Sequence, residues 1–273
     1  DIILNYANDI ALYLSDDWDI NERLKIHGGL RYSMFQQIGP FKRYNNDEFE
    51  NPIDTVVYDK GENVKFYQGL EPRFTFRYDL KHNSSIKGSF TQNYQYIHLA
   101  SFATVSLPTD VWVPSSDKVK PQFSTQYALG YFKNFKENQF ETSVEVYYKT
   151  MKNQVAYKDG AVPADNAGNN VDNAFVFGKG WSYGAEFFVK KRFGKVNGWI
   201  GYTLSWSEKQ FDELNNGEKF YAKYDRRNDA SVVFSYDVSK RVILAATWVY
   251  ATGNALTLPE SRYMIEGQIV NEY

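Results

Sequence analysis

Apolar and polar residues alternate along most of this chain with a period of two. In residues 10–18, the apolar side chains on one face are Ile10, Leu12, Leu14 and Trp18. The alternation returns in residues 24–34, after a polar break at residues 19–22. A period of two is typical of a half-buried β-strand, whereas a helix repeats every 3.6 residues. The two runs therefore predict a β-hairpin with one apolar and one polar face.

Eight further stretches show the same alternation. The predicted strands occupy residues 66–80, 85–100, 123–131, 140–148, 183–189, 200–206, 230–236 and 242–250. Short turns are expected at residues 19–22, 81–84, 136–138, 194–196 and 239–240, and long loops at residues 37–65, 101–120, 152–175 and 211–223. With the first hairpin this makes about ten antiparallel strands and no convincing helix, and no further strand is legible after residue 254.

The lengths of the strands and connections favour a membrane barrel. Residues 24–34 match the about 9–11 residues that a tilted strand needs to cross a bilayer, against about 5–6 in globular proteins. Short turns on one rim and long loops on the other are typical of a bacterial outer-membrane barrel. Soluble lipocalin-like barrels also alternate, so the pattern leaves that class open. We predict an all-β fold, an antiparallel up-and-down transmembrane β-barrel with short periplasmic turns and long extracellular loops.

The two faces support the same interpretation. The apolar face of the later strands carries Tyr, Phe, Val, Leu, Ile, Ala and Trp, while the opposite face is rich in Ser, Thr, Gly and charged residues. A wet lumen suits such a polar face, and lipid suits the apolar one. An interfacial girdle is expected near the short turns, formed by Trp18, Tyr78, Phe193 and Tyr236.

Composition limits the remaining alternatives. Aromatic residues make up 18% of the 273 residues, and tyrosine suits a surface that is half apolar and half wet. The mean hydropathy of -0.54 and the lack of a long apolar run argue against a transmembrane helix. A net charge of -2 gives no electrostatic reason to expect nucleic acid as a partner. The chain has no cysteine, which removes disulfides and thiolate metal sites.

Catalytic and metal-binding chemistry finds little support, and we expect neither an enzyme nor a cofactor. The three histidines, His27, His82 and His98, fall on different strands or a turn, without an HExxH or Gly-x-Ser-x-Gly motif. Acidic residues such as Asp16, Asp17 and Glu71 show no spacing that would make several oxygens converge on a cation.

The long connections hold the better candidates for ligand binding. Trp112, Trp181, Phe220 and Tyr221 lie on or beside them, and exposed aromatic rings often stack on sugars or apolar ligands. Loop self-packing or anchoring at the membrane rim would explain the same residues. Arg226 and Arg227 lie in the densest charged cluster and could bind carboxylate or phosphate, although structural ion pairs are the simpler explanation.

Five segments resemble the β-barrel of a TonB-dependent outer-membrane receptor of the Bacteroidetes type. They are ALYLSDDWDINERLKIHGGLRY (11–32), GLEPRFTFRYDLKHNSSIKGSFTQNYQYIHLAS (69–101), SYGAEFFVKKRFGKVNGWIGYTLSWSEKQF (182–211), YDRRNDASVVFSY (224–236) and YATGNALTLPE (250–260). The resemblance covers nearly the whole chain. It implies a 22-stranded barrel filled by an N-terminal plug, of which residues 1–273 would be the C-terminal part, without the plug and the closing strands.

The resemblance also implies a function and partners. Such a receptor sits in the outer membrane of a Gram-negative bacterium and takes up a scarce siderophore, vitamin, glycan or peptide. TonB would act through the missing plug and TonB box, outer-membrane lipid would surround the barrel, and a surface lipoprotein is a further partner to expect. Two alternatives stay open: a passive porin-like or structural barrel subunit, and a soluble β-rich binding protein.

Overall fold

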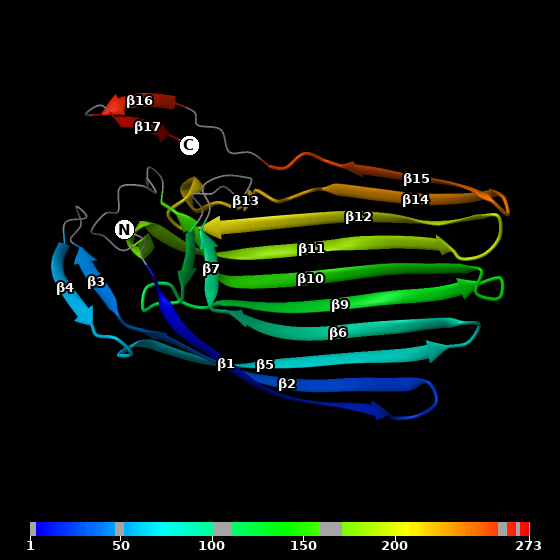
Figure 1. The fold of residues 1–273 in the computed structure, drawn as a ribbon, viewed down its shortest axis with the longest axis horizontal. Coiled ribbons are helices and arrows are strands. Elements are labelled where there is room, and N and C mark those ends of the chain that lie inside the picture. Colours follow the sequence, from blue (N-terminus) through cyan, green and yellow to red (C-terminus); the bar gives the residue numbers. More distant parts are fainter. Residues whose placement is uncertain are drawn as a thin grey trace.

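The main feature of the fold is one large antiparallel sheet whose strands follow each other in chain order (Figure 1). The computed structural model describes residues 4–46, 52–100, 111–158, 171–255, 261–265 and 268–272. The sheet contains β1 (Tyr6–Asp19), β2 (Leu24–Ile38), β5 (Asn63–Leu80), β6 (Ser84–Gln95), β9 (Gln122–Phe135), β10 (Phe140–Tyr157), β11 (Phe175–Lys191), β12 (Val196–Phe211), β14 (Asn228–Ser239) and β15 (Val242–Ala251). The predicted ten strands are confirmed.

The short and the long connections lie at opposite ends of the sheet, as the sequence predicts. All the short turns between paired long strands lie at one end of the sheet, the turn end, and the longer connections lie at the other, the loop end (Figure 1). Several strands extend further toward the loop end than the alternation indicated, since β10 reaches Tyr157 and β11 begins at Phe175. None of the helices in the described ranges is long and apolar enough to cross a membrane.

Four sequence predictions about strands and loops were wrong. The expected strand at residues 85–100 breaks before Tyr96, and its end forms a separate hairpin of β7 (Ile97–Ala100) and β8 (Val111–Pro114). The expected loop at residues 37–65 contains the hairpin of β3 (Phe41–Asn46) and β4 (Pro52–Tyr58). The loop at residues 211–223 contains β13 (Phe220–Tyr221), which pairs with β12. Finally, β16 (Ser261–Ile265) and β17 (Gln268–Glu272) form a hairpin that the sequence did not reveal. Two short 3-10 helices, η1 (Val171–Ala174) and η2 (Asn215–Gly217), complete the described elements.

The strand register separates two faces, which we call outer and inner. The outer face carries an aromatic row, directly opposed from strand to strand, of Phe90, Tyr127, Tyr148, Tyr183 and Trp206. The rings of Tyr183 and Trp206 stack at 5.4 Å, and those of Phe90 and Tyr127 lie 5.2 Å apart. The girdle residues Trp18, Tyr78, Phe193 and Tyr236 are all exposed, as expected near the turns. Cross-strand aromatic pairs stabilise a sheet by about 0.2–1 kcal/mol each.

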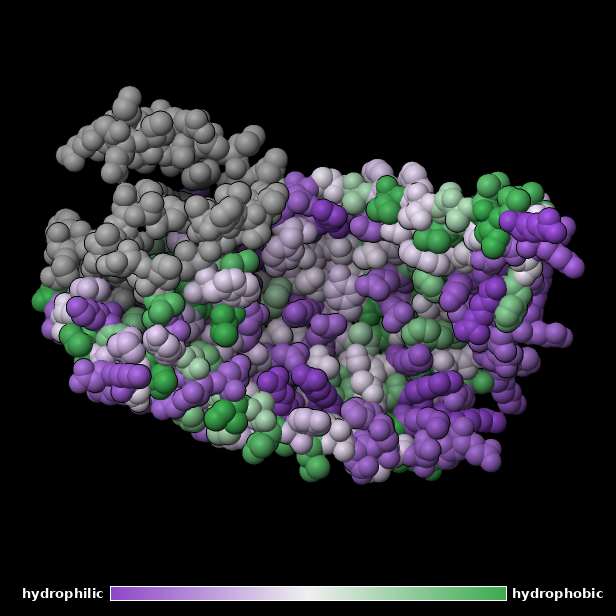
Figure 2. All heavy atoms as spheres, in the orientation of Figure 1, coloured by the Kyte–Doolittle hydropathy of each residue, from purple (hydrophilic) through white to green (hydrophobic). Residues whose placement is uncertain are grey.

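The inner face is polar and hollowed. Hydrophilic side chains cover much of the face seen in Figure 2, most densely toward the turn end. The side chains that project from it include His27, Thr75, Arg77, Lys87 and Glu145, and all of them line one hollow. The polar face therefore lies on the concave side of the sheet, as a lumen requires.

A small packed core lies at the loop end. Ala100, Val113, Val119 and Phe175 are buried there, with Val155 and Tyr157 packed against them. The Ser115 amide donates to the Tyr96 carbonyl at 2.7 Å and continues the pairing of the β7–β8 hairpin. Tyr67 Oη of β5 donates to the Ser116 carbonyl at 2.6 Å, which attaches the residues after β8 to the sheet. This segment thus lies over the sheet rather than extending away from it.

Candidate functional site

Three of the six predicted ligand-binding residues meet in one cluster on the outer face. Trp181 and Tyr221 both oppose Glu208 of β12, one position beyond the aromatic row toward the loop end. Lys219 Nζ lies 4.0 Å from the centre of the Trp181 ring. The Arg227 guanidinium lies 4.8 Å from the Tyr221 ring centre and 4.6 Å from that of Trp206. These cation–π contacts hold the aromatic residues in place.

The cations of this cluster already form ion pairs with nearby carboxylates. Arg227 Nη2 lies 3.4 Å from Asp225 Oδ2, and Asp225 Oδ1 accepts a hydrogen bond of 2.6 Å from the Ser207 amide. Lys219 Nζ lies 3.7 Å from Glu208 Oε2. Because these residues share the face of the aromatic row and are already partnered, their arrangement fits the rim-anchoring and self-packing alternatives. A ligand-binding role for Trp181, Tyr221 and Arg227 stays a prediction.

The other three predicted residues lie apart from this cluster. Phe220 opposes Lys209 on the inner face, and its ring packs 6.0 Å from that of the buried Phe211. Arg226 Nε donates to Asn254 Oδ1 at 2.9 Å. Trp112 lies on the separate β7–β8 hairpin and is 62% exposed, so it is the predicted aromatic residue most accessible to a ligand. Binding by these residues also stays a prediction.

Sequence reasoning missed a group of cations on the inner face toward the loop end. Arg31 of β2, Arg73 of β5 and Lys149 of β10 lie within two neighbouring cross-strand rows, and we call them the inner cation group. Arg73 leads through Thr91 and Gln126 to Lys149 in one continuous row. The alternation placed the two arginines on the polar face, but grouping them with Lys149 requires the register between strands.

A buried carboxylate lies between the two arginines. Glu71 is 1% exposed, and its Oε2 lies 3.6 Å from Arg31 Nη1 and 4.0 Å from Arg73 Nη2. Neither oxygen of Glu71 has a hydrogen-bond partner among the described residues. A buried anion without hydrogen bonds is costly unless cations compensate it. The two guanidinium groups supply that compensation, and Glu71 in turn fixes where they lie.

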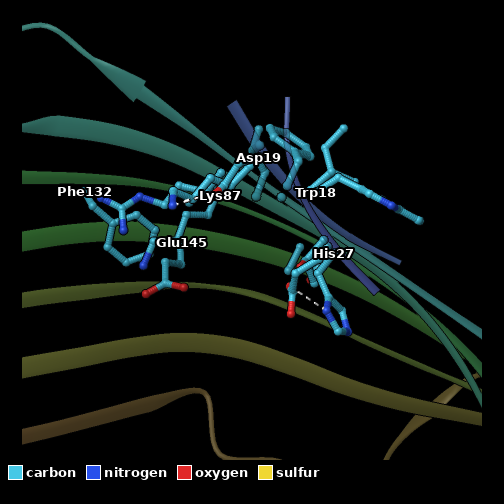
Figure 3. A pocket seen from close by; sticks show the side chains of 17 residues that line it. Trp18, Asp19, His27, Lys87, Phe132 and Glu145 are labelled. Atoms are coloured by element: carbon cyan, nitrogen blue, oxygen red, sulfur yellow. Dashed lines mark hydrogen bonds and ion pairs between the residues drawn. The ribbon is translucent and has the colours of Figure 1, made fainter. Parts of the chain in front are cut away.

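The hollow on the inner face lies nearer the turn end, because Asp19 and Lys25 at the turn between β1 and β2 line it. Figure 3 shows its lining side chains, among them His27, Lys87 and Glu145. The hollow measures about 770 Å³, and a row of directly opposed residues crosses it. In order across the sheet, the row contains Asp19, Lys25, Arg77, Lys87, Gly130, Glu145, Glu186, Thr203 and Asp229. Its three basic residues lie between Asp19 on one side and three carboxylates on the other, so this row has no single sign of charge.

Catalysis would need a nucleophile paired with a base, or a bound metal ion. His98 Nε2 lies 2.9 Å from Ser115 Oγ, yet the two residues are 1% and 0% exposed. His98 Nδ1 has no hydrogen-bond partner among the described residues, so no carboxylate orients the ring as nucleophilic catalysis requires. Within the described ranges, no three His, Asp or Glu side chains come together as a metal site.

We predict that acid loosens the β7–β8 hairpin. Burial lowers the pKa of His98 to about 4, below the value of about 6.5 expected for an unfolded chain. The stability that neutral His98 permits is fully present above pH 6.5 and is lost as the pH falls toward 4, by about 2 kcal/mol at pH 5. Hydrogen exchange of Val111–Pro114 should therefore accelerate between pH 7.5 and 5, after correction for the intrinsic rate. H98Q should remove that acceleration; equal exchange in both proteins would contradict the role of His98.

Comparison with known proteins agrees with this architecture. Residues 5–266 match the family model described as TonB dependent receptor-like, beta-barrel. No curated protein sequence matches the chain. Among solved structures, the siderophore receptor PiuA from Acinetobacter baumannii is similar with a TM-score of 0.62 and 14% identity over 90% of this chain and 33% of that one. The FrpB iron transporter from Neisseria meningitidis (F3-3 variant) follows with a TM-score of 0.57 and 15% identity, covering 89% of this chain and 32% of that one.

A third structure belongs to the same group. The ferric-catecholate import receptor Fiu from K12 E. coli matches with a TM-score of 0.57 and 14% identity, over 88% of this chain and 34% of that one. At such identities the likeness shows the fold alone, and the chain spans about a third of the length of these structures. The family model covers nearly all of the sequence, and the open sheet has the two faces of a barrel wall. The chain therefore belongs to the TonB-dependent receptor-like β-barrel family.

Proposed function

We propose that this chain forms part of the barrel wall of a TonB-dependent receptor that takes up a scarce nutrient across the outer membrane. The observation that carries the proposal is the curved antiparallel sheet with an aromatic, apolar outer face and a charged, hollowed inner face, in a chain that matches the family. The outer face contacts lipid, and the inner face lines the path of the transported molecule.

The rest of the receptor belongs to the same proposal. Residues 1–273 are a partial barrel, and a plug domain and the remaining strands lie outside this sequence. TonB acts on that plug and couples transport to the proton gradient across the inner membrane. The similar solved structures are described as an iron transporter, a ferric-catecholate import receptor and a siderophore receptor, which supports an iron-carrying nutrient as the first class to examine.

Conductance of the full-length receptor in a planar lipid bilayer tests this function without knowledge of the ligand. A receptor whose lumen is filled should show no steady open conductance, and it should co-purify with TonB from detergent extracts of whole cell envelopes. A passive pore would conduct steadily and independently of TonB. Steady conductance together with failure to bind TonB would overturn the proposal in favour of a porin-like barrel.

A further inference from the structure

We propose that the inner cation group, Arg31, Arg73 and Lys149, forms a binding wall for an oxyanionic solute, so that the molecule carried by this receptor bears negative charge. The inference rests on the proposed function for its biological meaning. The chemistry that the group recognises is a carboxylate, phosphate or deprotonated phenolate oxygen. Arginine presents a planar fork of donors to such groups, and lysine adds a compact positive charge.

The three cations face the lumen rather than lipid. Arg31 and Arg73 lie on the face opposite to the aromatic row, and their side chains are 39% and 48% exposed. Lys149 follows on the same face of β10, between Gln126 and Ser182 in the register. Adjacent strands lie about 4.8 Å apart, so Gln126 lies about 10 Å from Arg73 and about 5 Å from Lys149. Those separations are comparable with the Debye length of about 8 Å at physiological salt, so the potentials of the cations overlap.

The local balance of charge is positive. The two rows that hold the inner cation group also contain Lys209, and Glu71 is their one carboxylate among the described residues. Glu71 is buried and compensates part of the charge, while the side chains of Arg31 and Arg73 stay 39% and 48% exposed. Lys149 makes no ion pair with a described residue. Lys149 is half-buried, and a partly exposed cation without a fixed counter-ion is available to a solute.

Solvated charge is the simplest alternative, because any lumen wall carries charged residues. The row that crosses the hollow provides the comparison, since its three basic residues are followed by Glu145, Glu186 and Asp229 on the same face. Positive charge is therefore not a general property of this wall. A net positive balance holds for the two rows of the inner cation group, which lie nearer the loop end than the hollow and which a molecule arriving from outside would meet before the hollow.

Charged thiol reagents can measure this potential directly. These 273 residues contain no cysteine, so Q126C places a unique thiol within them at the centre of the row. We would compare the rate constants of a methanethiosulfonate reagent with a sulfonate group and one with a quaternary ammonium group, on the full-length receptor in outer membranes. N216C, in the connection between β12 and β13, normalises the intrinsic reactivity of the two reagents.

The expected result is a normalised preference for the anionic reagent of about 5- to 10-fold at Q126C, as a local potential near one kT would give. Adding R73Q and K149Q to Q126C should bring that preference down to about unity. K179Q is the matched control, because Lys179 lies on the outer face of β11 and its loss should leave the preference unchanged. Raising the salt concentration should also reduce the preference, through screening.

Three outcomes would overturn the inference. They are equal rates for the two reagents at Q126C, a preference for the cationic reagent, and failure of both reagents to reach the thiol, since a closed wall can bind no solute. The measurement does not depend on TonB. If the receptor prefers the anionic reagent but conducts steadily, the binding wall is supported and the proposed active transport is rejected. Failure of this inference and failure of the proposed function therefore give different results.

Discussion

Replacing Leu204 with arginine is expected to destabilise the membrane-embedded barrel by about 1–2 kcal/mol, between the cost of about 2–4 kcal/mol for a charged lipid-facing residue at the bilayer midplane and about 0–1 kcal/mol near the interfaces. Leu204 lies on the outer face of β12, opposite Ala185 on β11, between Tyr202 and Trp206. The aromatic row marks one edge of the apolar band, and Leu204 lies one outward position further toward the turn end. A guanidinium group at that position would have to enter hydrocarbon or pull water toward it.

The adjacent residue provides a matched control. Thr203 points to the inner face, and the register places it between Glu186 and Asp229. T203R introduces the same side chain into an acidic environment, so we expect no loss of stability. Both variants of the full-length receptor can be folded into phosphatidylcholine vesicles and titrated with urea, with the heat-modifiable gel mobility as the readout. Equal destabilisation by L204R and T203R would contradict the assignment of the two faces.

The strands could be predicted from the sequence because their two faces meet different environments. Leu204 and Thr203 are neighbours in the chain, and their difference in polarity follows directly from which face each occupies. The same parity could have located Trp181, which shares a face with Tyr183, Ala185 and Phe187. The sequence reasoning grouped Trp181 with loop residues instead, because β11 was expected to begin nearer the turn end.

The loop end could not be predicted in the same way, because long-range contacts decide its structure. Alternation continues through Tyr96, but the ring of Tyr96 stacks on Phe35 of β2, which lies 61 positions earlier in the sequence. The local pattern does not reveal a contact at that separation. The chain therefore leaves the sheet where local pattern would extend the strand. The inner cation group was missed for a related reason: the register that aligns Arg73 with Lys149 across four strands is a property of the sheet and not of any one segment.

Phe35 anchors the loop end, and F35A is expected to cost about 3–5 kcal/mol in stability. Phe35 is fully buried, and its ring lies parallel to that of Tyr96 with centres 5.2 Å apart. The Tyr96 hydroxyl in turn lies 2.8 Å from Ser33 Oγ. The backbone carbonyl of Tyr96 accepts the hydrogen bond from the Ser115 amide. Removing the Phe35 ring leaves a cavity beneath Tyr96 and weakens the point at which the β7–β8 hairpin is attached.

The effect should be local as well as global, because this hairpin is held through Tyr96 rather than through pairing with the main sheet. Hydrogen exchange of Val111–Pro114 in the full-length receptor should accelerate in F35A, whereas exchange of β12, which lies six strands from β2 in the sheet, should change little. F66A is the control: Phe66 lies on the neighbouring strand β5 and is 47% exposed, so its loss leaves no comparable cavity. Unchanged exchange of the hairpin in F35A would show that other contacts, and not the stacked pair of Phe35 and Tyr96, hold this segment over the sheet.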